Sequence, residues 1–288
     1  MPQQNTTPLV SYHGGHTLFD GEGRLEEFVE SAIAKGFSAI GFSEHMPPPP
    51  KYNYPHFPAP AEAKQQFAGY VDTVTHLQEK YRKDLPILLG VETEYLPDEE
   101  TYLADFLKEF CFDYVVGSVH FVAGIGFDSS QEKYDEAVEA CGGLPELAVE
   151  YYRCVRGLLA MNVVGVLGHL DLIDIFAAES ISGEQVRAAE DETLAAAKEA
   201  NVILDINARG LLKPVKRVYP RVELLKRACH MEIPATFGDD SHGPDQVGAR
   251  LDQSLQTMLA AGYTSIETLW PEDGGVVRKT CPLYPTIG

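Results

Sequence analysis

Residues 24–45, RLEEFVESAIAKGFSAIGFSEH, contain the unit that recurs throughout the chain and decides its fold. The first half predicts an amphipathic helix, and it is followed by Gly36, the residue type that most often ends a helix. Residues 37–42 form an apolar run that predicts a buried strand, and the polar pair Glu44-His45 comes directly after it. The helix prediction depends on apolar residues at the spacing of one helical face, which are Leu25, Phe28, Val29, Ala32 and Ile33.

The same alternation of strand, polar motif and helix continues to the end of the chain. It predicts parallel strands joined by crossover helices. We expect a closed α/β barrel, because polar motifs follow seven strands and the strand ends of a barrel share one face. An open doubly wound sheet would use only the strand ends at its switch point. The predicted strands are residues 9–12, 37–42, 87–91, 114–119, 163–167, 202–206, 233–237 and 265–269, and the predicted helices are 24–35, 61–81, 101–110, 145–161, 183–200, 221–230 and 245–262.

The composition is typical of one large domain over residues 1–288, in which residues 1–8 form a short polar tail. The chain is 44% hydrophobic, and we interpret its proline-rich residues 47–60 as a loop over one face of the domain. The net charge of −20 argues against a nucleic-acid partner, because phosphate backbones bind basic surfaces. Five scattered cysteines, no signal peptide and no apolar run of membrane-spanning length predict a cytoplasmic protein.

Histidine and acidic residues occur in short motifs at the expected ends of successive strands. Imidazole and carboxylate ligands without thiolates suit zinc, manganese or iron. The ligands are too many for one ion, so we expect two to three divalent metal ions, with carboxylates such as Glu92 and Asp240 offsetting their charge. His56, His76 and His230 lie outside the motifs and are expected to be ordinary polar residues. The motifs are Tyr12-His13-Gly14-Gly15-His16-Thr17, Ser43-Glu44-His45, Gly90-Val91-Glu92-Thr93-Glu94, Gly117-Ser118-Val119-His120, Gly168-His169-Leu170-Asp171 and Gly238-Asp239-Asp240-Ser241-His242.

The order of these motifs resembles the polymerase and histidinol phosphatase (PHP) superfamily. Several segments resemble its histidinol-phosphate phosphatase branch, and the resemblance covers nearly the whole chain between His13 and Leu269. It implies a distorted (β/α)7 barrel, similar to a TIM barrel, with a metal site at the C-terminal ends of the strands. The segments are residues 113–121 (DYVVGSVHF), 126–128 (GFD), 165–173 (GVLGHLDLI), 205–207 (DIN) and 238–248 (GDDSHGPDQVG).

The resemblance also implies a trinuclear metal site, in which one carboxylate bridges two ions. The third ion would need an acidic residue from the first loop. The spacing from His16, counted without a gap, favours Glu22, with Asp20 as the alternative. Two glycines separate the first two histidines, where the superfamily usually has one residue, so a local bulge is required. The implied ligands are His13, His16, Glu92 and Asp240 for the first metal, Glu92, His120 and His169 for the second, and His45, His242 and Glu22 for the third; Glu92, Asp240 and His242 are the expected catalytic residues.

The residues themselves predict metal-dependent hydrolysis, and the resemblance implies its substrate. Metal ions can activate water and bind a phosphate ester. The expected reaction is hydrolysis of L-histidinol phosphate to L-histidinol and phosphate in histidine biosynthesis. The superfamily places basic residues near Gly-His-x-Asp, but this chain has Leu172-Ile173-Asp174 there, so Arg209, Lys213 and Asn207 are the expected substrate-binding residues. The alternatives are another small phosphoester, a nuclease or a non-catalytic module.

Overall fold

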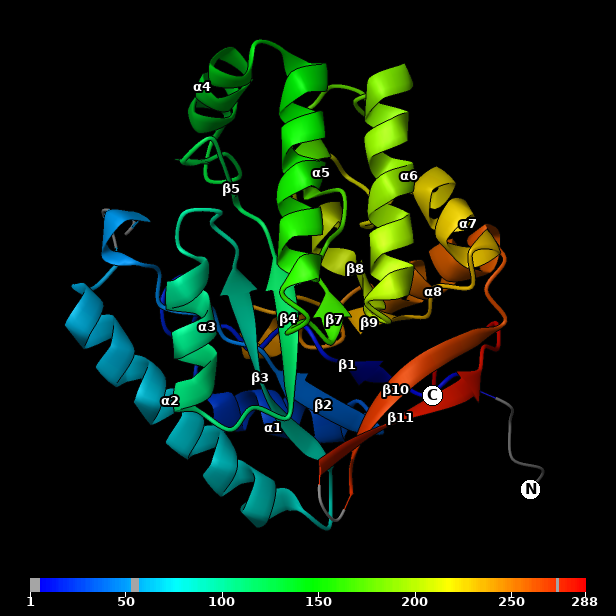
Figure 1. Cartoon of the computed structure of the whole chain (residues 1–288). Coiled ribbons are helices and arrows are strands. Elements are labelled where there is room, and N and C mark those ends of the chain that lie inside the picture. Colours follow the sequence, from blue (N-terminus) through cyan, green and yellow to red (C-terminus); the bar gives the residue numbers. More distant parts are fainter. Residues whose placement is uncertain (1–5, 53–56, 273–274) are drawn as a thin grey trace.

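The computed structural model describes residues 6–52, 57–272 and 275–288, and its centre is a sheet of seven parallel strands. The strands are hydrogen-bonded in chain order, so each crossover leads to the neighbouring position (Figure 1). This order agrees with the predicted alternation and confirms that the strands are parallel. The strands are β1 (Val10–Ser11), β2 (Ala39–Phe42), β3 (Ile87–Glu94), β4 (Tyr114–Ser118), β7 (Val166–Leu167), β8 (Ile203–Asn207) and β9 (Ala235–Gly238).

The two outer strands of the sheet, β1 and β9, come together and nearly close it into a barrel. The N–H of Tyr12 donates to the carbonyl of Phe237 at 3.1 Å, and the N–H of Asp240 donates to the carbonyl of His13 at 2.8 Å. The two hydrogen bonds lie at the C-terminal ends of β1 and β9 or just beyond them. The predicted α/β barrel is therefore confirmed, and the polar residues that follow β1 and β9 are brought side by side.

Helices surround the strands because each has one apolar face to bury. In α1, four residues of the predicted apolar face are buried, whereas Ile33 is 38% exposed. Each of the seven predicted helices is present, with ends that shift by a few residues. They are α1 (Leu25–Ala34), α2 (Pro60–Tyr81), α3 (Glu100–Glu109), α5 (Leu144–Ala160), α6 (Glu184–Glu199), α7 (Val222–His230) and α8 (Leu251–Ala261). No helix of the described chain is long and apolar enough to cross a membrane.

Some elements differ from the sequence prediction. The predicted last strand is present as β10 (Ser265–Glu272), but it pairs antiparallel with β11 (Gly275–Pro282) in a hairpin separate from the barrel sheet. The predicted helix 245–262 begins only at Leu251, because Gly248 and Arg250 have φ of 70° and 62°, in the left-handed region. Periodicity in the sequence does not reveal either the partner of a strand or a break in the backbone before a helix.

The segment after β4 also contains elements that the sequence analysis missed. β5 (Phe121–Val122) and β6 (Ile125–Gly126) form a short antiparallel hairpin, and α4 (Gln131–Cys141) follows it. The helix has many charged residues and buries only Tyr134 and Ala137, so its apolar pattern is weak. Ser130 caps its start by accepting a hydrogen bond from the N–H of Lys133. Of the proline-rich loop 47–60, residues 53–56, and with them His56, lie outside the described residues.

Candidate metal centre

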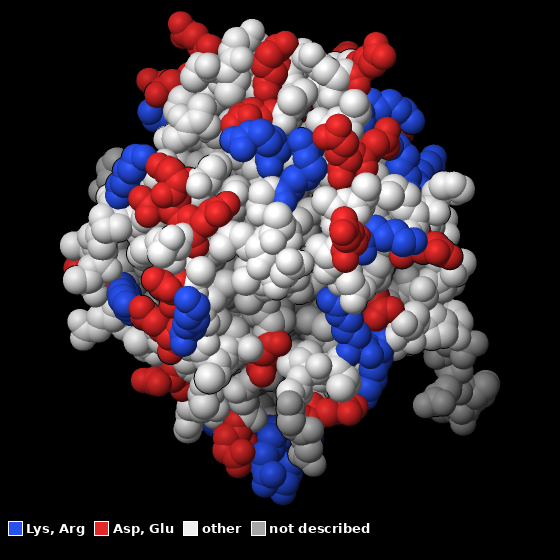
Figure 2. Space-filling model, viewed as in Figure 1, with Lys and Arg blue, Asp and Glu red and all other residues white. Residues whose placement is uncertain are grey.

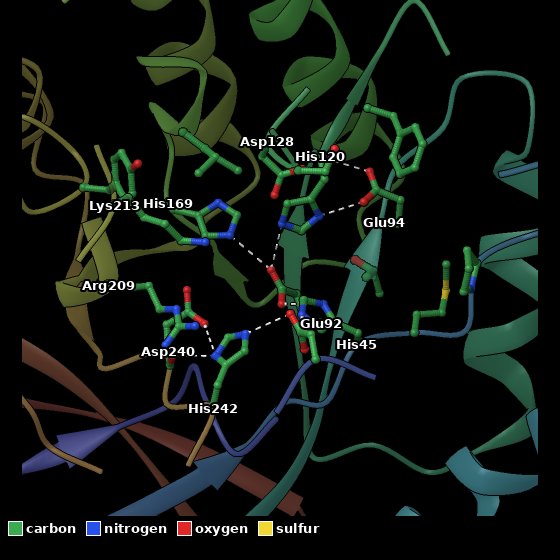
Figure 3. Close-up of a pocket in the computed structure, with 18 of the residues that line it drawn as sticks. His45, Glu92, Glu94, His120, Asp128, His169, Arg209, Lys213, Asp240 and His242 are labelled. Atoms are coloured by element: carbon green, nitrogen blue, oxygen red, sulfur yellow. Dashed lines mark hydrogen bonds and ion pairs between the residues drawn. The ribbon is translucent and has the colours of Figure 1, made fainter. Parts of the chain in front are cut away.

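The C-terminal ends of the barrel strands surround a cavity of about 280 Å³ that is lined by six of the nine predicted metal ligands. Each motif follows or ends a different strand, so parallel pairing is sufficient to bring the motifs together. Figure 3 shows Glu92 at the centre of the cluster, with imidazoles and carboxylates directed toward it. The labelled residues that line the cavity are His45, Glu92, Glu94, His120, Asp128, His169, Arg209, Lys213, Asp240 and His242.

Three sets of ligand atoms in the described residues are compact enough to hold a metal ion. Within each set, all the ligand atoms lie within 4.8 Å of one another. His13 and His16 each belong to two sets, so the sets adjoin and form one cluster. The sets are His13, Glu92 and His169; His13, His16 and Asp240; and His16, Asp20, His45 and His242.

Glu92 links the cluster, because both of its carboxylate oxygens contact histidines from other strands. Its Oε1 lies 3.1 Å from Nε2 of His169, 3.2 Å from Nε2 of His13 and 3.5 Å from Nε2 of His120. Its Oε2 lies 3.0 Å from Nδ1 of His45. His120 thus lies beside Glu92, although it is not a member of the three compact sets.

Carboxylates behind two of the histidines orient their rings, and a third carboxylate faces His16 at a longer distance. Nδ1 of His13 lies 2.6 Å from Oδ2 of Asp205, and Nδ1 of His120 lies 2.7 Å from Oε2 of Glu94. Nδ1 of His16 faces Oε1 of Glu44 at 3.6 Å, which is an ion-pair distance but too long for a hydrogen bond. In each case the opposite nitrogen, Nε2, is directed at the cluster. Such carboxylate partners orient metal-bound imidazoles and raise their basicity.

These three acidic residues lie within the sequence motifs, but no role was predicted for them. Glu44 lies next to His45, and Glu94 lies two residues after Glu92. Asp205 lies in β8, two residues before Asn207. Because side chains alternate across a strand, Glu92 and Glu94 are on the same side of β3. This alternation was the available signal for Glu94.

The glycines of the first motif allow both of its histidines to face the cluster, as predicted. Gly15 has a φ of 82°, in the left-handed region, and a Cβ there would lie 2.3 Å from Cδ1 of Phe42. The backbone therefore passes close to β2 and bends between the two histidines. The rings of His13 and His16 lie 5.9 Å apart, centroid to centroid.

The first loop contributes Asp20 to the cluster and not Glu22, which corrects the first choice from the sequence. Oδ2 of Asp20 lies 3.1 Å from Nε2 of His242, and Oδ1 lies 3.6 Å from Nε2 of His45. Glu22 is exposed, and its N–H donates to the carbonyl of His242 at 2.9 Å. Gly21 makes the intervening turn possible, because a Cβ there would lie 1.9 Å from the carbonyl oxygen of His16.

The expected role of Asn207 in substrate binding is also corrected. The residue is fully buried and is not part of the cavity lining. Its amide Nδ2 donates to Oδ2 of Asp205 at 2.9 Å and to Oδ2 of Asp240 at 3.2 Å. Asn207 therefore positions two carboxylates from beneath the cluster. Asp240 itself has a φ of 50°, which few non-glycine residues adopt, and its N–H is bonded to the carbonyl of His13.

The charges of the cluster stabilise one another against the cost of burial. Burial alone would raise the pKa of Glu92, but the positive charges of His13 and His45 outweigh this effect and hold it well below its ordinary value. Burial would lower the pKa of His120, but the negative charge of Glu94 raises it to about 9. The carboxylate of Glu92 therefore stays ionised and the imidazole of His120 holds its proton when histidine and carboxylate are the only charges present.

Several polar atoms at the cluster are buried and form no hydrogen bond with a described residue, although most of them face an oppositely charged side chain. Leaving such an atom unpaired costs about 1–3 kcal/mol, so their convergence needs an explanation. Nitrogen and oxygen donors in compact sets, without thiolates, fit divalent zinc, manganese or iron. The atoms are Nε2 of His13, both ring nitrogens of His16, Oε2 of Glu92 and Nδ1 of His169.

Comparison with known proteins places this site in a family. A family model of the PHP domain matches residues 11–209, more than half of the chain. The chain belongs to the PHP domain family. A protein of Schizosaccharomyces pombe named "Probable histidinol-phosphatase" is 32% identical over 286 residues, which cover 94% of this chain and 93% of that protein. The histidinol-phosphatase of Bacillus subtilis is 29% identical over 260 residues, which cover 84% of this chain and 96% of that protein.

Two solved structures share the fold of this PHP domain. A candidate histidinol phosphatase of Listeria monocytogenes superimposes with a TM-score of 0.76 at 28% identity, covering 83% of this chain and 97% of that one. The histidinol phosphate phosphatase of Lactococcus lactis, complexed with zinc, L-histidinol and phosphate, superimposes with a TM-score of 0.74 at 22% identity, covering 91% and 97%. The PHP barrel implied by the sequence is thereby confirmed.

Two basic residues of this PHP domain lie in the cavity wall, as expected. Arg209 and Lys213 both line the cavity, and Nη1 of Arg209 donates to Oε1 of Gln246 at 2.7 Å. Behind the wall, Arg217 contacts Asp171 at 2.9 Å, an ion pair that the sequence analysis missed. The two other histidines that were expected to be ordinary, His76 and His230, are exposed on α2 and at the end of α7.

Proposed function

We propose that this PHP protein is a metal-dependent phosphomonoesterase that hydrolyses L-histidinol phosphate to L-histidinol and phosphate. The convergence of the three ligand sets around Glu92 in one cavity is the observation that carries the metal-dependent chemistry. The substrate is supported by relatives that bear the name histidinol-phosphatase, two of which match 84% or more of this chain. The reaction assigns the protein to histidine biosynthesis.

The three sets would hold two or three divalent ions. Glu92 would bridge two of them, with His120 completing the second site, and Asp20, His45 and His242 would serve the third. When bound, such ions activate water and neutralise charge on the phosphate. We assign Glu92, Asp240 and His242 to the catalytic centre. Zinc is supported by the Lactococcus lactis complex, while the same donors also suit manganese and iron.

The remaining residues of the cavity would bind and orient the phosphate ester. Arg209 and Lys213 bring positive charge to a strongly acidic chain, and Arg209 is fixed by Gln246. A cavity of about 280 Å³ fits a small molecule. On the face in Figure 2, basic side chains are interspersed with acidic ones, which argues against binding of a nucleic-acid backbone. We place the activity in the cytoplasm, because all five cysteines are free.

A panel of phosphoesters tests the proposal. The purified protein should release phosphate from L-histidinol phosphate with a far higher kcat/KM than from p-nitrophenyl phosphate or a dinucleotide. Elemental analysis should find two to three transition-metal ions per chain. If a sugar or nucleoside phosphate is the better substrate, the named substrate is wrong and the metal chemistry stands. If only trace metal is found, and added zinc or manganese does not activate the protein, the metal chemistry is wrong as well.

A further inference from the structure

One acidic side chain of the cavity is not used by the metal centre. Five acidic residues line the cavity, and four of them contact histidines of the cluster. The fifth, Asp128, forms no hydrogen bond or ion pair with any residue in the described ranges. The negative charge of Asp128 helps to raise the pKa of His120, but that imidazole is already paired with Glu94 and is an expected metal ligand, so the half-buried carboxylate of Asp128 lacks a cation of its own. The four residues that contact histidines are Asp20, Glu92, Glu94 and Asp240.

The backbone on both sides holds Asp128 in place. Phe127 is fully buried, and its N–H donates to the carbonyl of His120 at 3.1 Å. On the other side, the hydroxyl of Ser129 donates to the carbonyl of Gly126 at 2.8 Å, and α4 begins shortly afterwards. Figure 3 shows the carboxylate of Asp128 beside His120 at the cavity. The position of this free carboxylate is therefore set by the hairpin β5–β6 and by α4.

An unpaired cation lies in the same cavity. Lys213 lines the cavity, and its ammonium group has no acidic partner among the residues described here, whereas Arg209 is held by Gln246. Within the described chain no ion pair joins Lys213 to Asp128, and the two lie on opposite sides of His169 in the view of Figure 3. A ligand with an anionic group and a cationic group would satisfy both side chains at once.

We propose that Asp128 binds the cationic amino group of the substrate and thereby selects phosphomonoesters that carry one. The inference rests on the proposed function, in which the phosphate binds at the metal centre with Arg209 and Lys213. In L-histidinol phosphate the ammonium is on the carbon next to the phosphorylated carbon, so it must lie close to the metal centre. Asp128, beside His120, is the free acidic group at that place. It is a specificity-determining residue and takes no part in the chemical step.

Substrates with and without the amino group test this role. Asp128→Asn should lower kcat/KM for L-histidinol phosphate by about tenfold to a hundredfold, the range for a lost hydrogen bond to a charged group. Most of the effect should be a higher KM, because the contact is the same in the ground and transition states. For the deaminated analogue, 3-(imidazol-4-yl)propyl phosphate, kcat/KM should change by no more than about twofold. Activity on the analogue also reports whether the variant is folded and metal-loaded.

Two further variants provide controls. Glu132→Gln removes a negative charge from the exposed first turn of α4 and should leave both substrates unaffected. Asp128→Glu retains the charge and should restore part of the preference for the aminated substrate. Equal losses on both substrates, or no loss on either, would overturn the assignment of Asp128. If the wild-type protein does not hydrolyse L-histidinol phosphate, the proposed function fails, and this inference fails with it.

Discussion

Two buried groups of charged side chains lie next to each other in this barrel, and they are neutralised in different ways. In the metal centre, histidines and carboxylates converge, and buried ring nitrogens have no hydrogen-bond partner among the described residues. In the second group, which we call the arginine cluster, guanidinium groups neutralise the carboxylates directly. The arginine cluster consists of Arg217, Arg221 and Arg227 with Asp171, Asp174 and Glu190.

A single sequence motif contributes one residue to the metal centre and another to the arginine cluster. In Gly168-His169-Leu170-Asp171, His169 contacts Glu92 of the metal centre, while Asp171 accepts from Arg217 and Arg221 of the arginine cluster. Fixed arginines cannot leave, so the arginine cluster holds the loops after β7 and β8 together. The metal centre has carboxylates and imidazoles without a fixed cation, so it depends on exchangeable ions.

Removal of the metal should give the largest difference between the two clusters. Dialysis against a chelator should abolish phosphate release, and added zinc or manganese should restore it, because the ions supply the activated water. The ion pairs of the arginine cluster should be unaffected by metal removal, so the far-UV circular dichroism of the metal-free protein should remain native. Activity that survives complete metal removal, checked by elemental analysis, would contradict the metal-dependent assignment.

Loss of a single ligand should have the next largest effect. His169→Ala removes a histidine that lies 3.1 Å from Glu92, and it should lower kcat by about a thousandfold or more. The same is expected for His120→Ala and Asp240→Ala. His76→Ala, on the exposed side of α2, is the matched control and should retain kcat within about threefold. If the ligand variants and the control have similar kcat values, the ligand assignment is wrong.

Removing a carboxylate behind a ligand should have an intermediate effect. Asp205→Asn keeps the shape of the side chain but loses the charge that orients His13 through Nδ1. Activity or metal affinity should fall by about tenfold to a hundredfold, as is typical of such partners. Metal titration followed by activity would measure both quantities. An effect as large as that of His169→Ala would instead indicate that Asp205 binds metal directly.

Breaking the arginine cluster should affect stability more than activity. Arg221→Met leaves Glu190 and Asp171 with fewer cationic partners, and it should lower the free energy of unfolding by about 3 kcal/mol. The folded variant should keep kcat within about tenfold, because Arg221 does not line the cavity. Urea unfolding measures the stability. Arg82→Met breaks an exposed pair with Glu79 and should change the free energy of unfolding by less than about 0.5 kcal/mol.

The sequence by itself determined the order of the barrel elements and most of the residues that meet at the strand ends. Apolar periodicity is a local property, and it was strong in helices such as α1 and α5, which bury one complete face. Parallel strands then place every strand end on one side of the molecule, so the motifs had to meet. This geometry is enough to explain the agreement for His13, His45, Glu92, His169 and Asp240.

Only the tertiary structure decided which side chains of the loops reach the cluster. The choice of Asp20 over Glu22 depends on the turn at Gly21 and on the bond between Glu22 and the carbonyl of His242, more than two hundred residues away. The burial of Asn207 beneath Asp240 is likewise a contact between two strand ends. Such contacts join residues distant in sequence, and loop side chains have no period that predicts where they point.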